Sequence, residues 1–527
     1  MKRALRITHF LPQVWCAIAM LLFVIAHVES SFATKIAKSG QSVSENDPFP
    51  PAHLSGTSVT LERGSYRLPT RPEQLPDQPF RYTVPQVTRT TMSTGLRVFY
   101  YPSRDLPIDY FIVVIKAGTR YDPAEKVGLA DLTARVVRAG GAGNRTGDEV
   151  DAELEKLGAE LSVSVERDYI RFQLFTLSEN SEKALQIFRD VLMAPRFEEE
   201  KFTTEKNLAL ERLRRQNDDP AEVSRREFRK IVYGTTHPLA RTPTRESLAS
   251  ISLDDLKSFY RAYYHPASAW VGVVHHRELR ETSRTLEQFF LDWRGEQVPH
   301  LPQIVEETPN SPSKVGRVYF SCKPGAQMQI RMGHFGRRRD PADQPVVDIL
   351  NNLFGTGGFS SRLMKVVRTQ HGFAYGVGGG VFEDDPVGLF VAVASTKTTN
   401  TTAALEAMRS VIVSMLEEKP SPAELETAKR DVLYTFATRM DNPREIVWQW
   451  LLHDFYGFPP EYLLHYPDRV GAVTADDVFA CARRYIKPKE IRCYLVGACD
   501  ALRESLAAEY SIEEWPLTNL ADETTTH

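Results

Sequence analysis

A pair of adjacent histidines with a nearby glutamate is the first group in this sequence that could bind a metal. His275 and His276 directly follow an apolar run, Trp270 to Val274, and Glu278 comes two residues later. Imidazole nitrogens and carboxylate oxygens are common zinc ligands. The apolar run predicts a strand, so the histidines would lie at a strand end or on the next loop. We therefore expect solvated loop histidines rather than a metal site.

A glycine-rich segment is a second candidate, because such turns can hold phosphate groups. The segment is Gly355-Thr356-Gly357-Gly358, and no Gly-Lys-Ser or Gly-Lys-Thr follows it. Since that lysine is what reaches the phosphates in a nucleotide-binding loop, we interpret the glycines as a tight turn.

Asp131 and Arg135 are a third candidate, because opposite charges four residues apart can pair on a helix. They lie within Gly128–Arg138, whose apolar residues have the spacing of one helix face: Leu129, Leu132, Val136 and Val137. The spacing predicts an ion pair across one helical turn.

The neighbouring sequence alternates between strand-like and helical segments. Strand patterns occur around Leu96–Tyr100, Phe111–Ile115, Leu161–Val165, Tyr169–Leu177 and Trp270–Val274. Ser178 and Asn180 could cap a helix that runs to Met193, and Thr203–Gln216 predicts another. Strands followed by runs of helices predict an α+β fold, with helices on one face of an antiparallel sheet.

Length and charge limit the classes of protein. The chain has 527 residues, which predicts two or more domains. A formal net charge of −3 gives no sign of nucleic-acid binding. Four cysteines, Cys322, Cys481, Cys493 and Cys499, lie in the second half, where they could be disulfides or buried thiols.

The N-terminus has the features of an export signal. Lys2, Arg3 and Arg6 precede the apolar run Ala17–Ala26, and small residues at Ser31-Phe32-Ala33 suggest cleavage after Ala33. The alternative is an uncleaved membrane anchor. We expect an exported, periplasmic or extracytoplasmic protein.

Two proline-rich stretches divide the rest of the chain, and the blocks on either side of the second one resemble each other. Ser252-Leu253-Asp254-Asp255 is echoed by Thr474-Ala475-Asp476-Asp477, and Asp219-Pro220 is echoed by Asn442-Pro443. The two pairs of matching motifs are separated by nearly the same number of residues, which indicates a duplicated domain. The expected segments are a signal peptide (1–33), a proline-rich arm (34–85), an N-terminal domain (86–295), a linker (296–314), a C-terminal domain (315–510) and a tail (511–527).

The segment Gly128–Val136 resembles the part of the pitrilysin, insulysin and mitochondrial processing peptidase family that carries the inverted zinc motif H-x-x-E-H. The flanking Ala117-Gly118-Thr119, Gly140-Gly141 and Leu157–Leu161 are similar to the family as well. This resemblance covers roughly residues 90–500. It implies two homologous sandwich domains, each an antiparallel sheet covered by helices, which form a clamshell.

The resemblance places the family's zinc chemistry on positions that have lost it. Asp131 stands for the first histidine, Ala134 for the glutamate and Arg135 for the second histidine, while the third ligand falls on Arg212. Zinc needs neutral imidazoles, and the glutamate must accept a proton from bound water. A guanidinium repels zinc and alanine takes no proton, so we expect no metal and no catalytic residue in this chain.

The second half keeps a different part of the family's site. Arg368 and Tyr375 match an arginine and a tyrosine that face the zinc in active relatives. An arginine can bind a substrate carbonyl or an oxyanion, and a tyrosine hydroxyl can donate a hydrogen bond to it. The alternative is a solvated arginine and a core tyrosine.

In heterodimeric relatives one subunit carries the zinc, and the other lacks it but keeps the arginine–tyrosine pair. The resemblance therefore implies a non-catalytic subunit that binds peptide substrates in trans, partnered by a homologous zinc-bearing subunit. The alternatives are a free-standing scaffold or peptide-binding protein, and an active zinc peptidase with an unrecognised site.

Overall fold

The computed structural model describes residues 82–293, 315–499 and 502–517. The predicted signal peptide, most of the predicted arm, the linker 296–314 and the residues after 517 lie outside this part of the chain. Among the helices that these ranges contain, none combines the length and the apolar character needed to cross a membrane.

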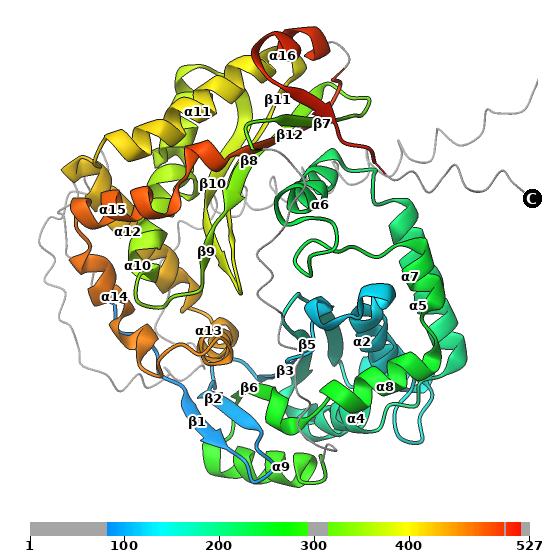
Figure 1. The fold of residues 1–527 in the computed structure, drawn as a ribbon. Coiled ribbons are helices and arrows are strands. Elements are labelled where there is room, and N and C mark those ends of the chain that lie inside the picture. Colours follow the sequence, from blue (N-terminus) through cyan, green and yellow to red (C-terminus); the bar gives the residue numbers. More distant parts are fainter. Residues whose placement is uncertain (1–81, 294–314, 500–501, 518–527) are drawn as a thin grey trace, which may run out of the picture. The chain divides into compact units, whose positions relative to one another are not determined.

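Two sheets form the framework, one in each half of the described chain (Figure 1). The first has the strand order β1-β2-β6-β3-β5-β4 and the second the order β13-β7-β12-β8-β11-β10-β9. The strands of the first sheet are β1 (Thr88–Thr91), β2 (Arg97–Pro102), β3 (Ile108–Ile115), β4 (Glu160–Val165), β5 (Ile170–Leu177) and β6 (Ala269–His275). Those of the second are β7 (Val318–Cys322), β8 (Gln327–Phe335), β9 (Arg337–Arg338), β10 (Ala374–Asp384), β11 (Leu389–Lys397), β12 (Arg492–Gly497) and β13 (Ile512–Glu514).

Helices fill the connections between these strands. In the first half they are α2 (Leu129–Ala139), α3 (Gly147–Lys156), α4 (Ser181–Met193), α5 (Glu199–Arg214), α6 (Pro220–Tyr233), α7 (Arg245–Ser250), α8 (Leu253–Tyr263) and α9 (Leu279–Phe290). In the second half they are α10 (Gln344–Asn351), α11 (Thr401–Glu417), α12 (Pro422–Arg439), α13 (Pro443–Phe455), α14 (Tyr462–Ala472), α15 (Ala475–Tyr485) and α16 (Arg503–Glu509). The α+β prediction is therefore confirmed.

The strand order shows that the two halves are copies of one topology. Five strands of the first half, β2-β6-β3-β5-β4, correspond in order and direction to β7-β12-β8-β11-β10 of the second. The repeated sequence motifs occupy equivalent places, since Ser252 and Thr474 each form a capping box at the start of α8 and α15. Asp219 and Asn442 likewise cap α6 and α13.

The sheets are mixed rather than purely antiparallel as expected. β2 pairs with β6 in parallel, and β7 pairs with β12 in parallel. β6 comes after α8 and β12 comes after α15, so the chain returns to β2 and to β7 by a long crossover through helices. Such a crossover is what parallel neighbours require.

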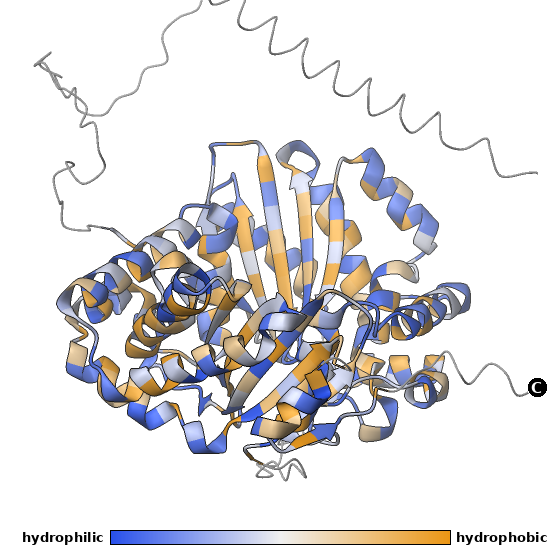
Figure 2. Ribbon diagram, turned by 90° about the horizontal axis from the view of Figure 1, so that it is seen from above, coloured by the Kyte–Doolittle hydropathy of each residue, from blue (hydrophilic) through white to orange (hydrophobic). Residues whose placement is uncertain are grey.

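Both faces of each sheet are covered, because one helix from each half packs on the sheet of the other half. Residues Phe111 and Val113 of β3 belong to the core of their own half. Ile112 and Val114 point to the other face and belong to the core of the second half, whose helix α13 packs on β2 and β6. In return, α6 packs against β8 and β12 through a core that contains Phe228. Figure 2 shows strands banded with alternating hydrophobic and hydrophilic residues. The helix exchange was not predicted from the sequence.

The ends of the described chain extend the cores further than expected. Strand β13, inside the predicted tail, pairs with β7, and the Trp515 indole donates a hydrogen bond to Glu227. At the other end, Val84 of the predicted arm is buried, and Trp450 donates a hydrogen bond to the Pro85 carbonyl. Both corrections have the same cause: apolar residues in these polar stretches find a surface on the second half.

Candidate functional site

Helix α2 carries three of the residues that the resemblance assigns to the family's zinc motif, Asp131, Ala134 and Arg135. Its N-terminus is held by Asp122, whose carboxylate accepts hydrogen bonds from the backbone N–H groups of Gly128 and Ala130, both at 2.8 Å. Gly128 adopts a φ of 106°, a left-handed conformation that favours glycine. Burial raises the pKa of the Asp122 carboxyl to about 7. The start of α2, and so the position of Asp131, is therefore fixed by local structure.

Three of the four replaced positions form one ion-pair cluster. The Nε atom of Arg135 lies 2.8 Å from Oδ2 of Asp131, and an Nη atom of Arg212, from α5, lies 3.3 Å from the same oxygen. The ion pair predicted from the i, i+4 spacing is present, and the hydrogen bond with Asp131 raises the pKa of Arg135. One carboxylate between two guanidinium groups leaves the cluster with a net positive charge.

These residues do not fit the zinc ion that the family's motif would hold. The guanidinium groups of Arg135 and Arg212 have no lone pair to offer, and their charge repels a cation. Ala134 is fully buried and supplies no oxygen. Asp131 is the one remaining donor in this set, and its Oδ2 already accepts from both arginines. No catalytic step can be derived through a metal at this position.

Arg368 and Tyr375 are brought together in the second half. Arg368 lies in the π-helical segment Met364–Gln370, and its guanidinium carbon lies 5.3 Å from the centre of the Tyr375 ring. The same group lies 4.8 Å from the ring of Phe359, a residue for which the sequence analysis had no role. Tyr375 is 80% exposed, which is inconsistent with a core aromatic residue. The cluster is open to any molecule that meets this face.

The histidine pair differs from the expected solvated loop. His275 is buried at the end of β6, and both histidines lie against the fully buried Asp109 of β3. His276 Nδ1 lies 3.0 Å from Oδ1 of Asp109, and His275 Nε2 lies 3.4 Å from Oδ2. Within residues 82–293, 315–499 and 502–517, this is the one group of three His, Cys, Asp or Glu side chains close enough to share an ion. A sequence pattern could not reveal it, because Asp109 lies far away in the chain.

The geometry of this cluster favours hydrogen bonding over metal binding. The two imidazole rings are stacked, with centroids 4.6 Å apart and planes 22° from parallel. A metal lies in the ring plane of its histidine ligand, and two stacked planes do not meet at a nearby point. In addition, His275 Nδ1 accepts the backbone N–H of Arg277, which places its proton on Nε2. Burial lowers the pKa of His275 to about 4, so the ring is neutral near pH 7.

The cysteines, whose state was left open, divide into two kinds. Cys322 and Cys499 form a disulfide that joins the end of β7 to the segment after β12. Cys481 and Cys493 are buried thiols, and burial raises the pKa of each to about 12. A thiol with such a pKa is a poor nucleophile at neutral pH.

Two segments of the sequence match two domains of one peptidase family. Residues 108–242 match "Insulinase (Peptidase family M16)", and residues 250–432 match "Peptidase M16 inactive domain". An uncharacterized zinc protease of Rickettsia felis is 23% identical over 401 residues, which is 75% of this chain and 93% of the relative. The non-peptidase homolog YmxG of Helicobacter pylori is 23% identical over 345 residues, which is 64% of this chain and 76% of the relative.

A solved structure shows the same fold. The peptidase M16 inactive domain from Pseudomonas fluorescens superimposes with a TM-score of 0.71 at 24% identity, covering 78% of this chain and 98% of that one. The family resemblance predicted from the zinc-motif segment is thereby confirmed. By both of its halves, the chain belongs to peptidase family M16.

Proposed function

We propose that this chain is a non-catalytic, substrate-binding or regulatory subunit of an exported heterodimeric zinc peptidase of family M16. The proposal rests on the ion-pair cluster of Asp131, Arg135 and Arg212. At the positions that the resemblance assigns to zinc ligands it has two guanidinium groups, which cannot bind zinc, and one carboxylate that is paired with both. A homologous subunit with an intact H-x-x-E-H motif would supply the metal and the chemistry on peptides. The non-peptidase homolog among the relatives is consistent with such a role.

Arg368 and Tyr375 would act on that chemistry from across the subunit interface. Their side chains are adjacent, and the exposed Tyr375 hydroxyl is free to reach a molecule outside this chain. In the assembled site the guanidinium would bind the carbonyl or oxyanion of the scissile bond, and the hydroxyl would donate a hydrogen bond to it.

The peptide itself would bind as an added strand. β4 is the last strand of the first sheet and lies beside α2, so its outer edge offers backbone N–H and C=O groups next to the replaced motif. Pairing through the backbone gives affinity with little dependence on peptide sequence. This suits a subunit that holds a substrate without cutting it.

Export is supported by two features of different kinds. The N-terminal sequence has a basic region, an apolar run and a small-residue cleavage pattern. The Cys322–Cys499 disulfide is of the kind that persists in oxidising compartments such as the periplasm.

Reconstitution with the H-x-x-E-H homologue of the same genome tests the proposal. Arg368→Ala should lower kcat of the complex about a hundred- to thousandfold, since that is what loss of one oxyanion donor costs. Tyr375→Phe, which removes only the hydroxyl, should lower kcat while subunit affinity stays unchanged. Arg483→Ala is a matched control, because Arg483 also lies over an aromatic ring, that of Phe479, but on α15.

Two results would count against the subunit model. One is a chain that stays monomeric beside every H-x-x-E-H homologue in light scattering. The other is full activity of both the Arg368→Ala and the Tyr375→Phe complex, which would leave this chain as a scaffold.

A further inference from the structure

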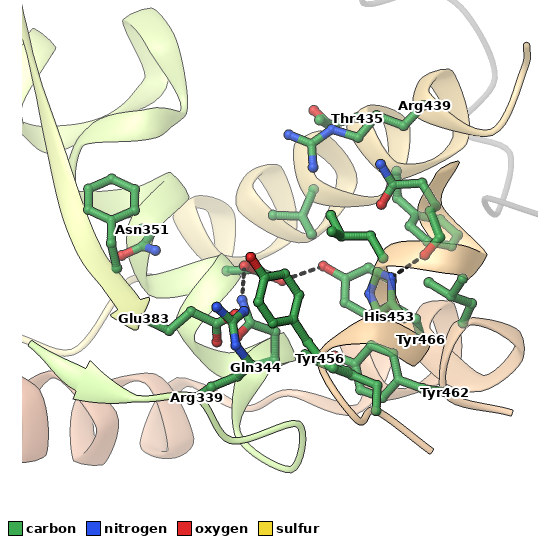
Figure 3. A pocket seen from close by; sticks show the side chains of 18 of the residues that line it. Arg339, Gln344, Asn351, Glu383, Thr435, Arg439, His453, Tyr456, Tyr462 and Tyr466 are labelled. Carbon is green, nitrogen blue, oxygen red and sulfur yellow. Dashed lines mark hydrogen bonds and ion pairs between the residues drawn. The ribbon is translucent and has the colours of Figure 1, made fainter. Parts of the chain in front are cut away.

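A pocket in the second half has no part in the site described above. It has a volume of about 460 Å³ and lies between α10, β10, α12, α13 and α14 (Figure 3). This volume is in the range of small-molecule sites. Figure 3 shows His453, Tyr462 and Tyr466 on one side of the pocket, with Arg339 and Glu383 on the other.

One carboxylate in the pocket makes no direct ion pair with a described residue, although Arg337 and Arg439 are near enough to lower its pKa against the larger effect of burial. Asp348 accepts hydrogen bonds from the Tyr466 hydroxyl at 2.6 Å and from Nε2 of Gln344 at 2.9 Å, but it forms no ion pair with any described residue. Glu383, on the opposite wall, is already paired with Arg337 and Arg339. Burial raises the pKa of Asp348, and a bound cation beside it would favour its ionised form. The floor of the pocket therefore offers a buried carboxylate with which a cationic group of a ligand can pair directly.

The rim offers the opposite charge. Arg439, the last residue of α12, lines the pocket and is exposed, and within the described ranges it has no ion-pair partner. The other arginine of the pocket, Arg339, is committed to Glu383 and lies 3.7 Å from the centre of the Tyr456 ring. Arg439 is thus the pocket's available anion-binding group.

The walls between these two charges are aromatic and contain unused polar atoms. The hydroxyl of the buried Tyr462 has no hydrogen-bond partner among the residues that the structure describes. His453 Nδ1 donates to the Gln449 carbonyl at 2.7 Å, which leaves Nε2 as an acceptor. Aromatic faces attract organic ammonium groups as well as apolar side chains.

We propose that this pocket binds a small zwitterion of the amino-acid type, a free amino acid or dipeptide with a large apolar side chain. Its ammonium group would lie by Asp348 and the ring of Tyr466, and its carboxylate would pair with Arg439. The apolar side chain would pack against Phe436 and Leu452 of the wall. The assignment does not depend on a partner subunit or on peptide cleavage.

Calorimetry on the purified full chain tests the charge pattern with a matched set of ligands. L-phenylalanine and L-leucylphenylalanine provide both charges. Phenylalanine amide lacks the carboxylate, and N-acetylphenylalanine lacks the ammonium group. We expect at least one zwitterion to bind, and both single-charge analogues of phenylalanine to bind at least about tenfold more weakly, because each loses a charge-assisted contact.

Variants locate the site. Arg439→Gln should weaken binding about tenfold or more without unfolding the chain, since the side chain is exposed, and Tyr462→Phe removes one buried hydroxyl. Arg430→Gln is the matched control, because Arg430 is an exposed arginine of the same helix that does not line the pocket. The proposal is overturned if no zwitterion binds, if the single-charge analogues bind equally well, or if Arg430→Gln weakens binding as much as Arg439→Gln.

Discussion

At the scale of single residues, the positions that the family resemblance assigns to the zinc motif hold an ordered ion-pair cluster. Two arginines and one aspartate now join α2 to α5 where a metal would have joined them. The contact also fixes the alignment of α5: Arg212 faces Asp131, whereas Glu211, one residue earlier, pairs with Arg214. The position assigned to the third ligand is therefore the one that faces the motif.

We predict that the family's ligand set can be restored on this backbone. The purified chain should hold no stoichiometric zinc, because guanidinium groups occupy the ligand positions. The fourfold variant Asp131→His, Ala134→Glu, Arg135→His and Arg212→Glu should bind about one zinc per chain, measured by atomic emission after gel filtration.

A threefold variant that keeps Arg212 is the control and should bind zinc more weakly, because its guanidinium faces the site. If the unmodified chain carries one zinc that is lost in His276→Ala, the metal is held by the Asp109 cluster, and our account of that cluster is wrong.

Individual residues were predictable where the interaction is local. The Asp131–Arg135 pair follows from the i, i+4 spacing, whereas the contact with Arg212 depends on the packing of two helices. The environment of His275 was predicted incorrectly, because its partner Asp109 comes from another strand. Ser178 was expected to cap a helix, but its hydroxyl donates to the same Asp109 carboxylate.

At the scale of elements, the exchange of α6 and α13 determines which core each helix stabilises. Phe228 of α6 is fully buried against the second sheet, although α6 belongs to the first half of the sequence. Amphipathic spacing predicts a helix here, but not which sheet it covers. That choice depends on contacts between residues hundreds of positions apart.

Phe228→Ala should therefore destabilise the second half more than the first. The cavity should cost about 3–5 kcal/mol, as for other buried phenylalanines. In hydrogen exchange, the amides of β8 and β12 should lose more protection than those of β3 and β5.

Phe188→Ala, in α4 and the first core, is the matched control and should give the reverse pattern. Equal loss of protection in both sheets by both variants would mean that the two cores unfold as one unit.

His453 of helix α13 should make the free energy of unfolding depend on pH. Burial lowers the pKa of His453 to about 4, against an ordinary value of 6.5, so folding favours the neutral ring. The resulting stability is fully present above pH 6.5 and is lost as pH falls towards 4. The difference in pKa corresponds to about 3 kcal/mol.

Chemical denaturation between pH 4 and 7.5 measures this effect. His453→Asn should make the free energy of unfolding less dependent on pH. His465→Asn, at an exposed position of α14, should leave that dependence unchanged. A slope that is identical in both variants would assign the acid sensitivity to other groups.

At the scale of the whole described molecule, a buried ion network links the two halves. Arg120 pairs with Asp168 of its own half and with Asp384 of the other, at 2.8 and 2.6 Å. Arg167 pairs with the same Asp384, and the Tyr456 hydroxyl donates to Asp168. The carboxylates and guanidinium groups of this network neutralise one another. Removing one of them leaves its partner as an unpaired charge in a low-dielectric environment, which destabilises the folded state.

Asp384→Ala should lower the free energy of unfolding by about 3–5 kcal/mol, because it leaves buried Arg120 without one of its partners. Thermal and denaturant unfolding would measure the loss. Asp476→Ala is the control: its pair with Lys419 is exposed on both sides and should contribute less than about 1 kcal/mol. Similar losses in the two variants would show that burial of the network adds nothing.

The duplication was the part of the architecture most accessible to sequence analysis. Capping motifs such as Ser252 and Thr474 repeat because the same helix start is needed twice. Strand pairing across the long crossovers, the exchanged helices and the ion network were not accessible, because each joins residues that are distant in sequence. The Arg368–Tyr375 contact was suggested by the family resemblance rather than by any local pattern.

The exchanged helices also affect how the chain is made. A ribosome completes the first half before it has translated α13, so the sheet face formed by Ile112 and Val114 lacks its cover during this interval. An apolar face of this kind is a surface for chaperones to bind. Final packing of either half must therefore wait until the other half has been synthesised.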